Sequence, residues 1–525
     1  MAAMPHFTAS YDDFLQYPLN LPSALKYGTY ALSQHRQRLY DCKDRLFVSN
    51  SSKTQAQFRL PVRDISSTGR VDKLNIFNDS QLESFLRCGN PQGMNSGSSS
   101  NGHVASKQDE QCRFIFLWAE HTVGPLRLSA IMLLRLLSFY QVNPHFLDFL
   151  YAYASPHAED RELHFSGFRT EKTLINPVPG TKVPELGRSG RRFQLCYNLK
   201  TAAPKPGGNW KIRQAAFHHQ FDVGQATQLW IIGDPHAALK DRIGELYCDK
   251  NTYDTSFSTL EQAFRSSLET HIAFAQWATS EWRWNVRFLE QGAEDLTLSA
   301  ALINEKSHIE SLDPGSLGRV QRWEEKTNDT IMAMESNANI MKLLQRFYRD
   351  LVKDDDFPSK ARRLCQQAAK SFCLQLDELI CETQMQISRA KVLIRTVADR
   401  KTIHLQTQSA LISSKLTASM YDQADRSAVE AIAVRIVTIV TLIYLPATFS
   451  STFFSTDVVK YQDGEVFSQI ALDRFLQVTL PLMFLTFVPA GIWFWLERRR
   501  RAKRSHETKG YFTDFFSQDT DSSTH

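Results

Sequence analysis

Two long runs of apolar residues near the C-terminus dominate the hydropathy pattern of the chain. Residues 436–456 (IVTIVTLIYLPATFSSTFFST) and 475–496 (FLQVTLPLMFLTFVPAGIWFWL) contain no charged side chain. A helix rises about 1.5 Å per residue, so each run covers the roughly 30 Å apolar core of a bilayer. Two buried core helices are the alternative, but such helices seldom run this far without a charge. We therefore expect a first transmembrane helix over 431–456 and a second over 475–496.

The flanking charges predict how this hairpin is oriented. The second run is followed by ERRRRAKR, whereas the linking segment 457–474 holds only Lys460 and Arg474 as basic residues. Cytoplasmic flanks of membrane spans are enriched in Lys and Arg. We therefore expect 457–474 to be a non-cytoplasmic loop and 497–525 a basic cytoplasmic tail, which puts both termini in the cytoplasm. The polar end of the tail, from Ser505 on, is expected to be disordered.

A long helical stalk is predicted ahead of the first span. No glycine lies between Gly318 and Gly464 and no proline between Pro358 and Pro446, so the two strongest helix breakers are absent together. Apolar or small residues recur at the three- and four-residue spacing of a packed helix seam: Cys373, Leu376, Ile380, Ile387, Ala390, Ile394 and Val397. The stalk is assigned to 258–430, with earlier helices at 258–289 and 319–352 and a turn at 353–358. Its last helix continues into the first span.

The N-terminal half has the mixed pattern of an α/β or α+β domain. Strands are expected at 113–118, 193–200, 212–221 and 228–232, and a helix at 126–140. A Gly/Ser-rich stretch between them predicts a disordered loop over 90–112. The cytoplasmic domain is therefore assigned to 113–250, while the fold of 1–89 is left open. The predicted fold class is a multidomain membrane protein: this domain, the helical stalk and the two-helix hairpin.

Composition and motifs narrow the function. The net charge of +5 is too small over 525 residues to indicate nucleic-acid binding. The sequence has no P-loop, Rossmann glycine fingerprint, GxSxG or HExxH motif, so no enzymatic activity is predicted. His218 and His219 point to opposite faces of a predicted strand and are interpreted as ordinary strand residues. Eight cysteines without a CxxC pair indicate a reducing compartment.

The C-terminal region resembles the CorA magnesium-channel superfamily. The resemblance rests on the giant helix, the two spans, the basic end, and the stretch Tyr444-Leu445-Pro446-Ala447-Thr448-Phe449, which is similar to the first span of the family. The segments 210–214 (WKIRQ) and 219–222 (HQFD) also look like its divergent fungal branch. The resemblance is specific over about 400–500, moderate over 110–240 and vague elsewhere.

This resemblance implies a homopentamer whose first transmembrane helices line a pore. Thr448 matches the pore threonine of the family, and Val434 and Val437 match its hydrophobic gate. Counted from Pro446, the Gly-Met-Asn signature falls on Ser455, Thr456 and Asp457, none of which matches it. Five Asp457 carboxylates would form a ring that attracts a hydrated cation, so Asp457 is the tentative metal ligand and altered selectivity is expected.

The residues themselves add two observations. Thr441, Thr448, Thr452 and Ser455 share one helical face, which is either a pore lining or a helix-packing stripe of small residues. Asp463, Glu465 and Asp473 make the linking loop acidic; this is either a cation-concentrating mouth or a solvated loop.

We therefore predict a transporter of Mg²⁺ or another divalent cation, with no permanently bound cofactor, whose partners are lipid, divalent cations and its own copies. The alternative is a non-conducting relative with a binding or regulatory role in the cytoplasm. A plasma or vacuolar membrane location is expected.

Overall fold

The computed structural model describes residues 3–48, 58–67, 69–88, 108–119, 124–153, 164–234, 237–248, 257–301, 315–455 and 469–518. The chain divides into two compact units, Met1–His404 and Leu405–His525, and each is treated by itself below. The predicted disordered loop falls for the most part on residues outside this description, and only 108–112 of it are described.

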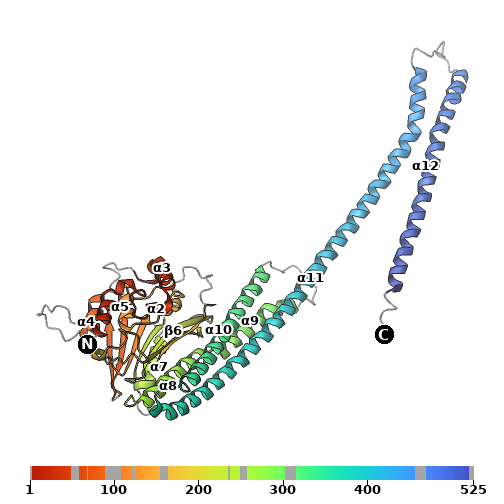
Figure 1. The fold of residues 1–525 in the computed structure, drawn as a ribbon. Helices are drawn as coiled ribbons and strands as arrows, with labels where there is room; N and C mark the ends of the chain where they lie inside the picture. Colours follow the sequence, from red (N-terminus) through yellow and green to blue (C-terminus); the bar gives the residue numbers. More distant parts are fainter. Residues whose placement is uncertain are drawn as a thin grey trace. The chain divides into compact units, whose positions relative to one another are not determined.

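A seven-stranded mixed sheet forms the centre of the first unit (Figure 1). Its strand order is β2-β1-β3-β7-β6-β5-β4, in which β3 and β7 pair in parallel and all other neighbours are antiparallel. The strands are β1 (Leu60–Ile65), β2 (Val71–Ile76), β3 (Cys112–Trp118), β4 (Phe168–Thr173), β5 (Arg192–Pro204), β6 (Trp210–Asp222) and β7 (Thr227–Asp234). Residues 60–76, whose fold the sequence left open, thus supply two strands of the same sheet.

Helices cover both faces of this sheet, which makes a three-layer α/β domain. Side chains of β3 alternate between the layers: Phe114 and Phe116 join one apolar cluster, and Ile115 and Leu117 join the other. The second cluster contains residues of α1 (Ala3–Asp12), α3 (Thr29–Leu46), α4 (Asp79–Cys88), α5 (Ala130–Tyr140) and α6 (Phe146–Leu150). The short helix α2 (Ala24–Tyr27) has no buried residue. The first cluster contains α7 (Ala237–Cys248) and the long helices described below. The predicted fold class is confirmed.

The predicted helix at 126–140 begins later than expected, at Ala130. Leu126 instead forms isolated bridges with Phe47 and Ala119, which holds this segment extended. Ser129 then caps the helix, because its hydroxyl accepts a hydrogen bond from the backbone N–H of Met132 at 3.1 Å. Two short 3-10 helices, Phe14–Gln16 and Pro184–Leu186, also lie in the described part of the domain.

His218 and His219 are core residues on opposite faces of β6, as the sequence predicted. His219 stacks on Trp230 with ring centroids 3.9 Å apart, and His218 lies 3.4 Å from the sulfur of Cys196. Burial lowers the pKa of His218 to about 3. Both rings are therefore neutral packing elements at physiological pH.

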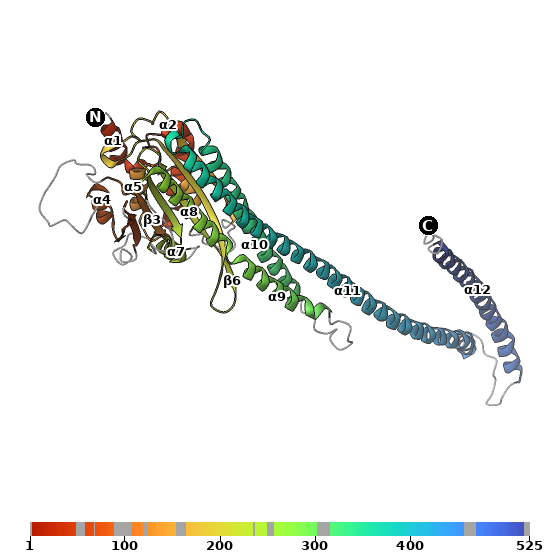
Figure 2. The ribbon, with the colours of Figure 1, turned by 90° about the horizontal axis from the view of Figure 1, so that it is seen from below.

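Long helices pack beside the sheet domain in the same unit (Figure 2). They are α8 (Leu260–Thr279), α9 (Trp282–Ala301), α10 (Gly315–Leu351) and α11 (Ser359–Ser455). The single helix predicted over 258–289 is divided at Ser280 and Glu281. Side-chain donors occupy carbonyls there: the Trp282 indole donates to the Ala278 carbonyl at 2.6 Å, and the Ser280 hydroxyl to that of Trp277 at 3.3 Å.

The predicted seam of α11 is confirmed. Six of its seven residues are buried and Ile394 is partly buried. The turn predicted at 353–358 is also present, closed by the Phe357 N–H donating to the Asp354 carbonyl at 3.1 Å. Arg362 reinforces it by donating to the carbonyls of Asp354, Asp355 and Phe357.

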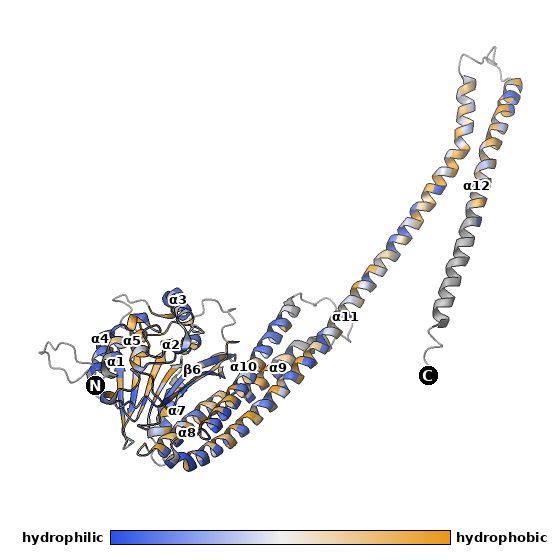
Figure 3. Ribbon diagram, in the orientation of Figure 1, coloured by the Kyte–Doolittle hydropathy of each residue, from blue (hydrophilic) through white to orange (hydrophobic). Residues whose placement is uncertain are grey.

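The second unit contains the end of α11 and all of α12 (Gln469–Gln518). Two stretches are long and apolar enough to cross a membrane, Ile412–Phe453 and Leu472–Trp493. Figure 3 shows them as the orange segments of the two helices. Helix α12 continues to Gln518, so the expectation of disorder from Ser505 on is wrong for 505–518.

Candidate functional site

The candidate site lies on the apolar part of α11, where polar side chains interrupt a hydrophobic surface. This part belongs to the stretch Ile412–Phe453, which is long and apolar enough to cross a membrane. A helix satisfies its own backbone hydrogen bonds, which is the condition for crossing a bilayer. Polar groups on its surface must then face either another helix or water.

Six of the predicted site residues lie on one face of this helix. They are Val434, Val437, Thr441, Thr448, Thr452 and Ser455, all exposed within the chain. Successive residues of an α-helix are rotated by about 100°, so these six positions fall within about 60° of one another around the axis. They therefore form a continuous line along the helix, which we call the α11 stripe.

The four hydroxyl groups of the stripe donate their protons to the helix itself. Thr448 donates to the Tyr444 carbonyl at 2.9 Å, Thr452 to that of Thr448 at 2.8 Å, and Ser455 to that of Thr452 at 3.0 Å. Thr441 donates in the same way to Thr438, also at 3.0 Å. With the proton committed to the backbone, each oxygen keeps its lone pairs for an outside partner. The stripe thus presents acceptors, the groups that bind cations or water molecules.

The stripe continues toward the N-terminus of α11 beyond the residues found from the sequence. Glu430 and Ser427 fall on the same face by the same rotation, and both are exposed. The signal that identifies them is the same three- and four-residue spacing, continued for two more turns toward the N-terminus. The order along the face is then a carboxylate at Glu430, an apolar band at Val434 and Val437, and hydroxyl oxygens from Thr441 onward.

Two positions on the opposite side of α11 are covered. Pro446 and Ser450 are buried and lie about 150° or more from the middle of the stripe. Partly buried positions of α12 likewise recur on one side of that helix: Phe475, Leu482, Met483, Thr486 and Ala490, with Thr479 fully buried among them. The rest of the opposite side of α11 is exposed and apolar, with Ile432, Ile436, Ile439 and Ile443, so the stripe differs from it in carrying oxygen atoms.

The remaining predicted residues are Thr456, Asp457, Asp463 and Glu465, which lie outside the described residues. The carboxylate ring at Asp457 and the acidic mouth therefore stay predictions. Asp473, near the start of α12, is described and exposed.

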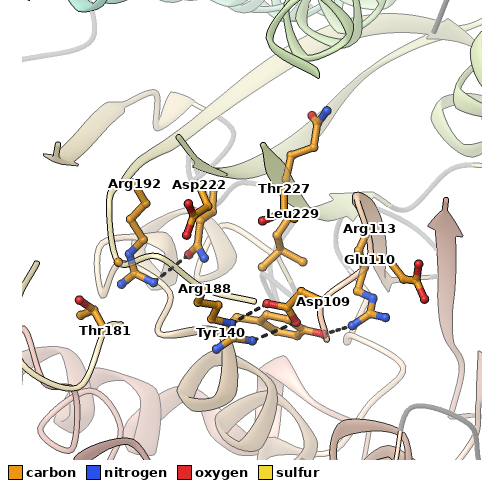
Figure 4. A pocket seen from close by; sticks show the side chains of 13 residues that line it. Asp109, Glu110, Arg113, Tyr140, Thr181, Arg188, Arg192, Asp222, Thr227 and Leu229 are labelled. Carbon is orange, nitrogen blue, oxygen red and sulfur yellow. Dashed lines mark hydrogen bonds and ion pairs between the residues drawn. The ribbon is translucent and has the colours of Figure 1, made fainter. Parts of the chain in front are cut away.

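A polar pocket in the sheet domain is a second candidate site (Figure 4). Arg188 forms an ion pair with Asp109 at 2.5 Å, and Arg113 pairs with Asp64 at 2.6 Å through two nitrogens. Arg113 also donates to the Tyr140 hydroxyl at 2.7 Å. The cavity holds about 20 Å³, which is room for about one water molecule. These arginines therefore hold the walls of the pocket together through ion pairs and hydrogen bonds. The pocket has no space for an organic substrate.

Comparison with known proteins gives a matching family and similar solved structures. A family model described as "CorA-like transporters" matches residues 9–301. No curated protein matches the chain. The crystal structure of the ZntB cytoplasmic domain from Vibrio parahaemolyticus is similar with a TM-score of 0.28 and 8% identity, over 64% of this chain and 97% of that chain. The family match falls on the sheet domain and the first long helices, whereas the sequence resemblance was most specific near the spans.

Proposed function

The chain belongs to the CorA-like transporter family, and on that premise we propose that it conducts divalent cations, Mg²⁺ or a related ion, across a membrane. The observation that carries the proposal is the α11 stripe. It places cation-binding oxygens along an uncovered face of a helix that is long and apolar enough to span a bilayer.

The proposed assembly is a homopentamer in which five copies of α11 surround the conducting path. Each chain has one stripe of oxygen atoms on an otherwise apolar, exposed part of α11, so a closed ring would turn the stripes inward and leave the apolar sides to α12 and lipid. The band at Val434 and Val437 then forms a hydrophobic constriction, which blocks ions by excluding water when it is narrow. Such a ring has the parts of a gated pore.

Oxygen ligands support a hard divalent ion. Mg²⁺ binds oxygen and loses its water reluctantly, so hydroxyl and carboxylate oxygens around a hydrated ion suit it. In the proposed pore these are Thr441, Thr448, Thr452 and Ser455, with Asp457 at the outer end and Asp463 and Glu465 around the mouth. The replaced signature at 455–457 is the proposed source of altered selectivity. The ion is cargo, and we propose neither a resident cofactor nor an enzymatic role.

The proposed topology puts both termini in the cytoplasm. Six basic residues follow the second span within eight positions, in the segment 497–504 (ERRRRAKR). A basic cluster next to a span is retained on the cytoplasmic side. The proposed location is the plasma or vacuolar membrane.

A second candidate function is a non-conducting relative that works through its soluble domain. The family match favours this candidate, because the match covers residues 9–301 and ends before either membrane span. The signature position carries Ser455 and, beyond it, Thr456 and Asp457.

Ion uptake separates the two candidates. The chain is expressed in cells that lack their own Mg²⁺ uptake, and growth and divalent-ion entry are followed. Asp457→Asn should reduce entry, because it neutralises the proposed ring. The matched control is Asp356→Asn, which removes an exposed acidic charge from the turn between α10 and α11 and should leave entry near the wild-type rate.

Membrane insertion without entry of any divalent ion would favour the non-conducting alternative. Unchanged entry in Asp457→Asn would reject the carboxylate ring while leaving transport intact. A particle mass in detergent that differs from five chains would reject the pentamer.

A further inference from the structure

Three metal-binding side chains from distant parts of the sequence meet in the sheet domain. His35 lies on α3, His145 immediately precedes α6, and Asp148 lies within α6. One donor atom from each of the three lies within 4.8 Å of the others. We propose that His35, His145 and Asp148 form a binding site for a transition-metal ion of the Zn²⁺ class.

The distances around Asp148 fit a shared ion. The Nδ1 atom of His35 lies 3.5 Å from one carboxylate oxygen, and the Nδ1 atom of His145 lies 3.5 Å from the other. Zn²⁺ binds nitrogen and oxygen ligands at about 2.0–2.2 Å in tetrahedral geometry, which separates two ligand atoms by about 3.4 Å. Both separations match a carboxylate and an imidazole on the same ion.

The same two nitrogens lack hydrogen-bond partners. Nδ1 of His35 and Nδ1 of His145 are both buried and accept or donate no hydrogen bond. Their 3.5 Å separations from Asp148 exceed the 2.7–3.2 Å of an N–H···O hydrogen bond. Buried polar atoms are nearly always satisfied. A metal ion at this point would satisfy both nitrogens at once.

Another pair in the same unit shows how a His and an Asp lie when a hydrogen bond alone joins them. His164 Nε2 lies 2.8 Å from the carboxylate of Asp329, which is an ordinary hydrogen-bond distance. That pair has one imidazole and one carboxylate. The His35 group differs in having two imidazoles around one carboxylate and in its longer separations.

The surrounding structure holds the ligands in place and leaves a way in. The Tyr151 hydroxyl donates to the backbone carbonyl of His35 at 2.9 Å, and the backbone N–H of His145 donates to the side-chain oxygen of Asn143 at 3.0 Å. The His35 side chain is nearly buried, whereas the side chain of His145 is 35% exposed. Water can therefore reach the exposed side and complete the coordination.

The donor set selects the kind of ion. Two imidazoles and one carboxylate suit Zn²⁺, Co²⁺ or Ni²⁺, whereas Mg²⁺ requires oxygen ligands. The site is thus chemically distinct from the oxygen-lined α11 stripe. It does not depend on whether the chain conducts ions.

The test uses the purified full chain in detergent, stripped of metal with a chelator. Zn²⁺ is titrated by calorimetry, and Co²⁺ is added as a spectroscopic probe of nitrogen and oxygen coordination. The variants are His145→Gln and Asp148→Asn, with His164→Gln as the matched control. Far-UV circular dichroism checks that each variant is folded; the two ligand substitutions lie at partly exposed positions, which favours folding.

We expect wild type and His164→Gln to bind one more equivalent of Zn²⁺ per chain than either ligand variant. The ligand variants should also lose the visible d–d absorption of bound Co²⁺. Equal stoichiometry in folded wild type and folded ligand variants would overturn the proposal. The proposal would also be overturned if Co²⁺ bound to the wild-type chain gave no absorption beyond that of the aqueous ion. The three residues would then be only a packed polar cluster.

Discussion

Asn337 of α10 takes the place of a missing strand at the edge of the sheet. Strand β4 pairs with β5 only from Arg192 to Tyr197, so the edge of β5 is open at Lys200. There the Lys200 N–H donates to the Asn337 side-chain oxygen at 2.9 Å, and the Asn337 amide donates to the Lys200 carbonyl at 2.6 Å. Both residues are fully buried. This amide therefore joins the long helices to the sheet domain.

Asn337→Ala removes both bonds, together with a third bond from the Asn337 amide to the Ala278 carbonyl at 3.2 Å. It leaves the two backbone groups of Lys200 buried without these partners. Each unsatisfied group costs about 1–3 kcal/mol, so we expect the free energy of unfolding to fall by about 3 kcal/mol. Chemical denaturation of the full chain in detergent, followed by tryptophan fluorescence, measures this loss. Trp230, Trp277 and Trp282 are buried reporters in the same unit.

Asn328→Ala is the matched control, because Asn328 is an exposed asparagine on the same helix. We expect it to change the free energy of unfolding by less than about 0.5 kcal/mol. If Asn337→Ala is equally mild, the amide does not replace a strand and the reasoning about this junction is refuted.

Three further predictions concern single groups. Burial lowers the pKa of Lys200 to about 8, below its unfolded value of 10.5, so the free energy of unfolding should rise as the pH rises from 8 to 10.5. Lys200→Met should raise the free energy of unfolding at pH 7 by up to about 3 kcal/mol and should flatten this pH dependence in denaturation curves. An unchanged pH dependence in the variant would contradict the prediction. Cys381 is exposed whereas Cys365 and Cys373 are buried, so mass spectrometry of the native chain should find a thiol reagent on Cys381 before the other two. Glu430→Gln should lower divalent-ion uptake if the stripe conducts, and an unchanged rate would remove Glu430 from the path.

The spans and the stalk could be predicted from the sequence because their signals are local and periodic. An uncharged run identifies a span, and the seam from Cys373 to Val397 repeats every three or four residues over many turns. The strands β5 and β6 were found for a similar reason, since both are rich in apolar residues. In each case one stretch of chain contains all the information that the assignment needs.

The contacts that needed distant partners were not predictable. Strands β1 and β2 are short, and three of the six residues of β2 are exposed, so only the pairing of β1 with β3 and of β2 with β1 identifies them. Asn337 looks like any polar helix residue until Lys200 is placed beside it. His145 and Asp148 have the three-residue spacing of metal ligands, but His35 lies 110 positions earlier in the chain. A single sequence gives no indication that these segments meet.

The α11 stripe lies between these cases. Its residues could be selected from their spacing, and the structure adds that Pro446 and Ser450 are covered while the stripe is not. The surface that faces the stripe depends on the assembled protein, and we propose that it is formed by other copies of α11.

The most direct test of the central claim is ion flux through purified protein whose α11 carries a single introduced thiol. Thr448→Cys puts the thiol on the stripe, and Ile439→Cys puts it on the opposite, also exposed, side of the same helix. The spans contain no native cysteine. Divalent-ion uptake into liposomes is measured before and after a positively charged thiol reagent is added. If the stripe lines the conducting path, wild type conducts, the reagent blocks Thr448→Cys and it spares Ile439→Cys. Absence of flux in wild type, or equal block of both variants, would contradict a stripe-lined path.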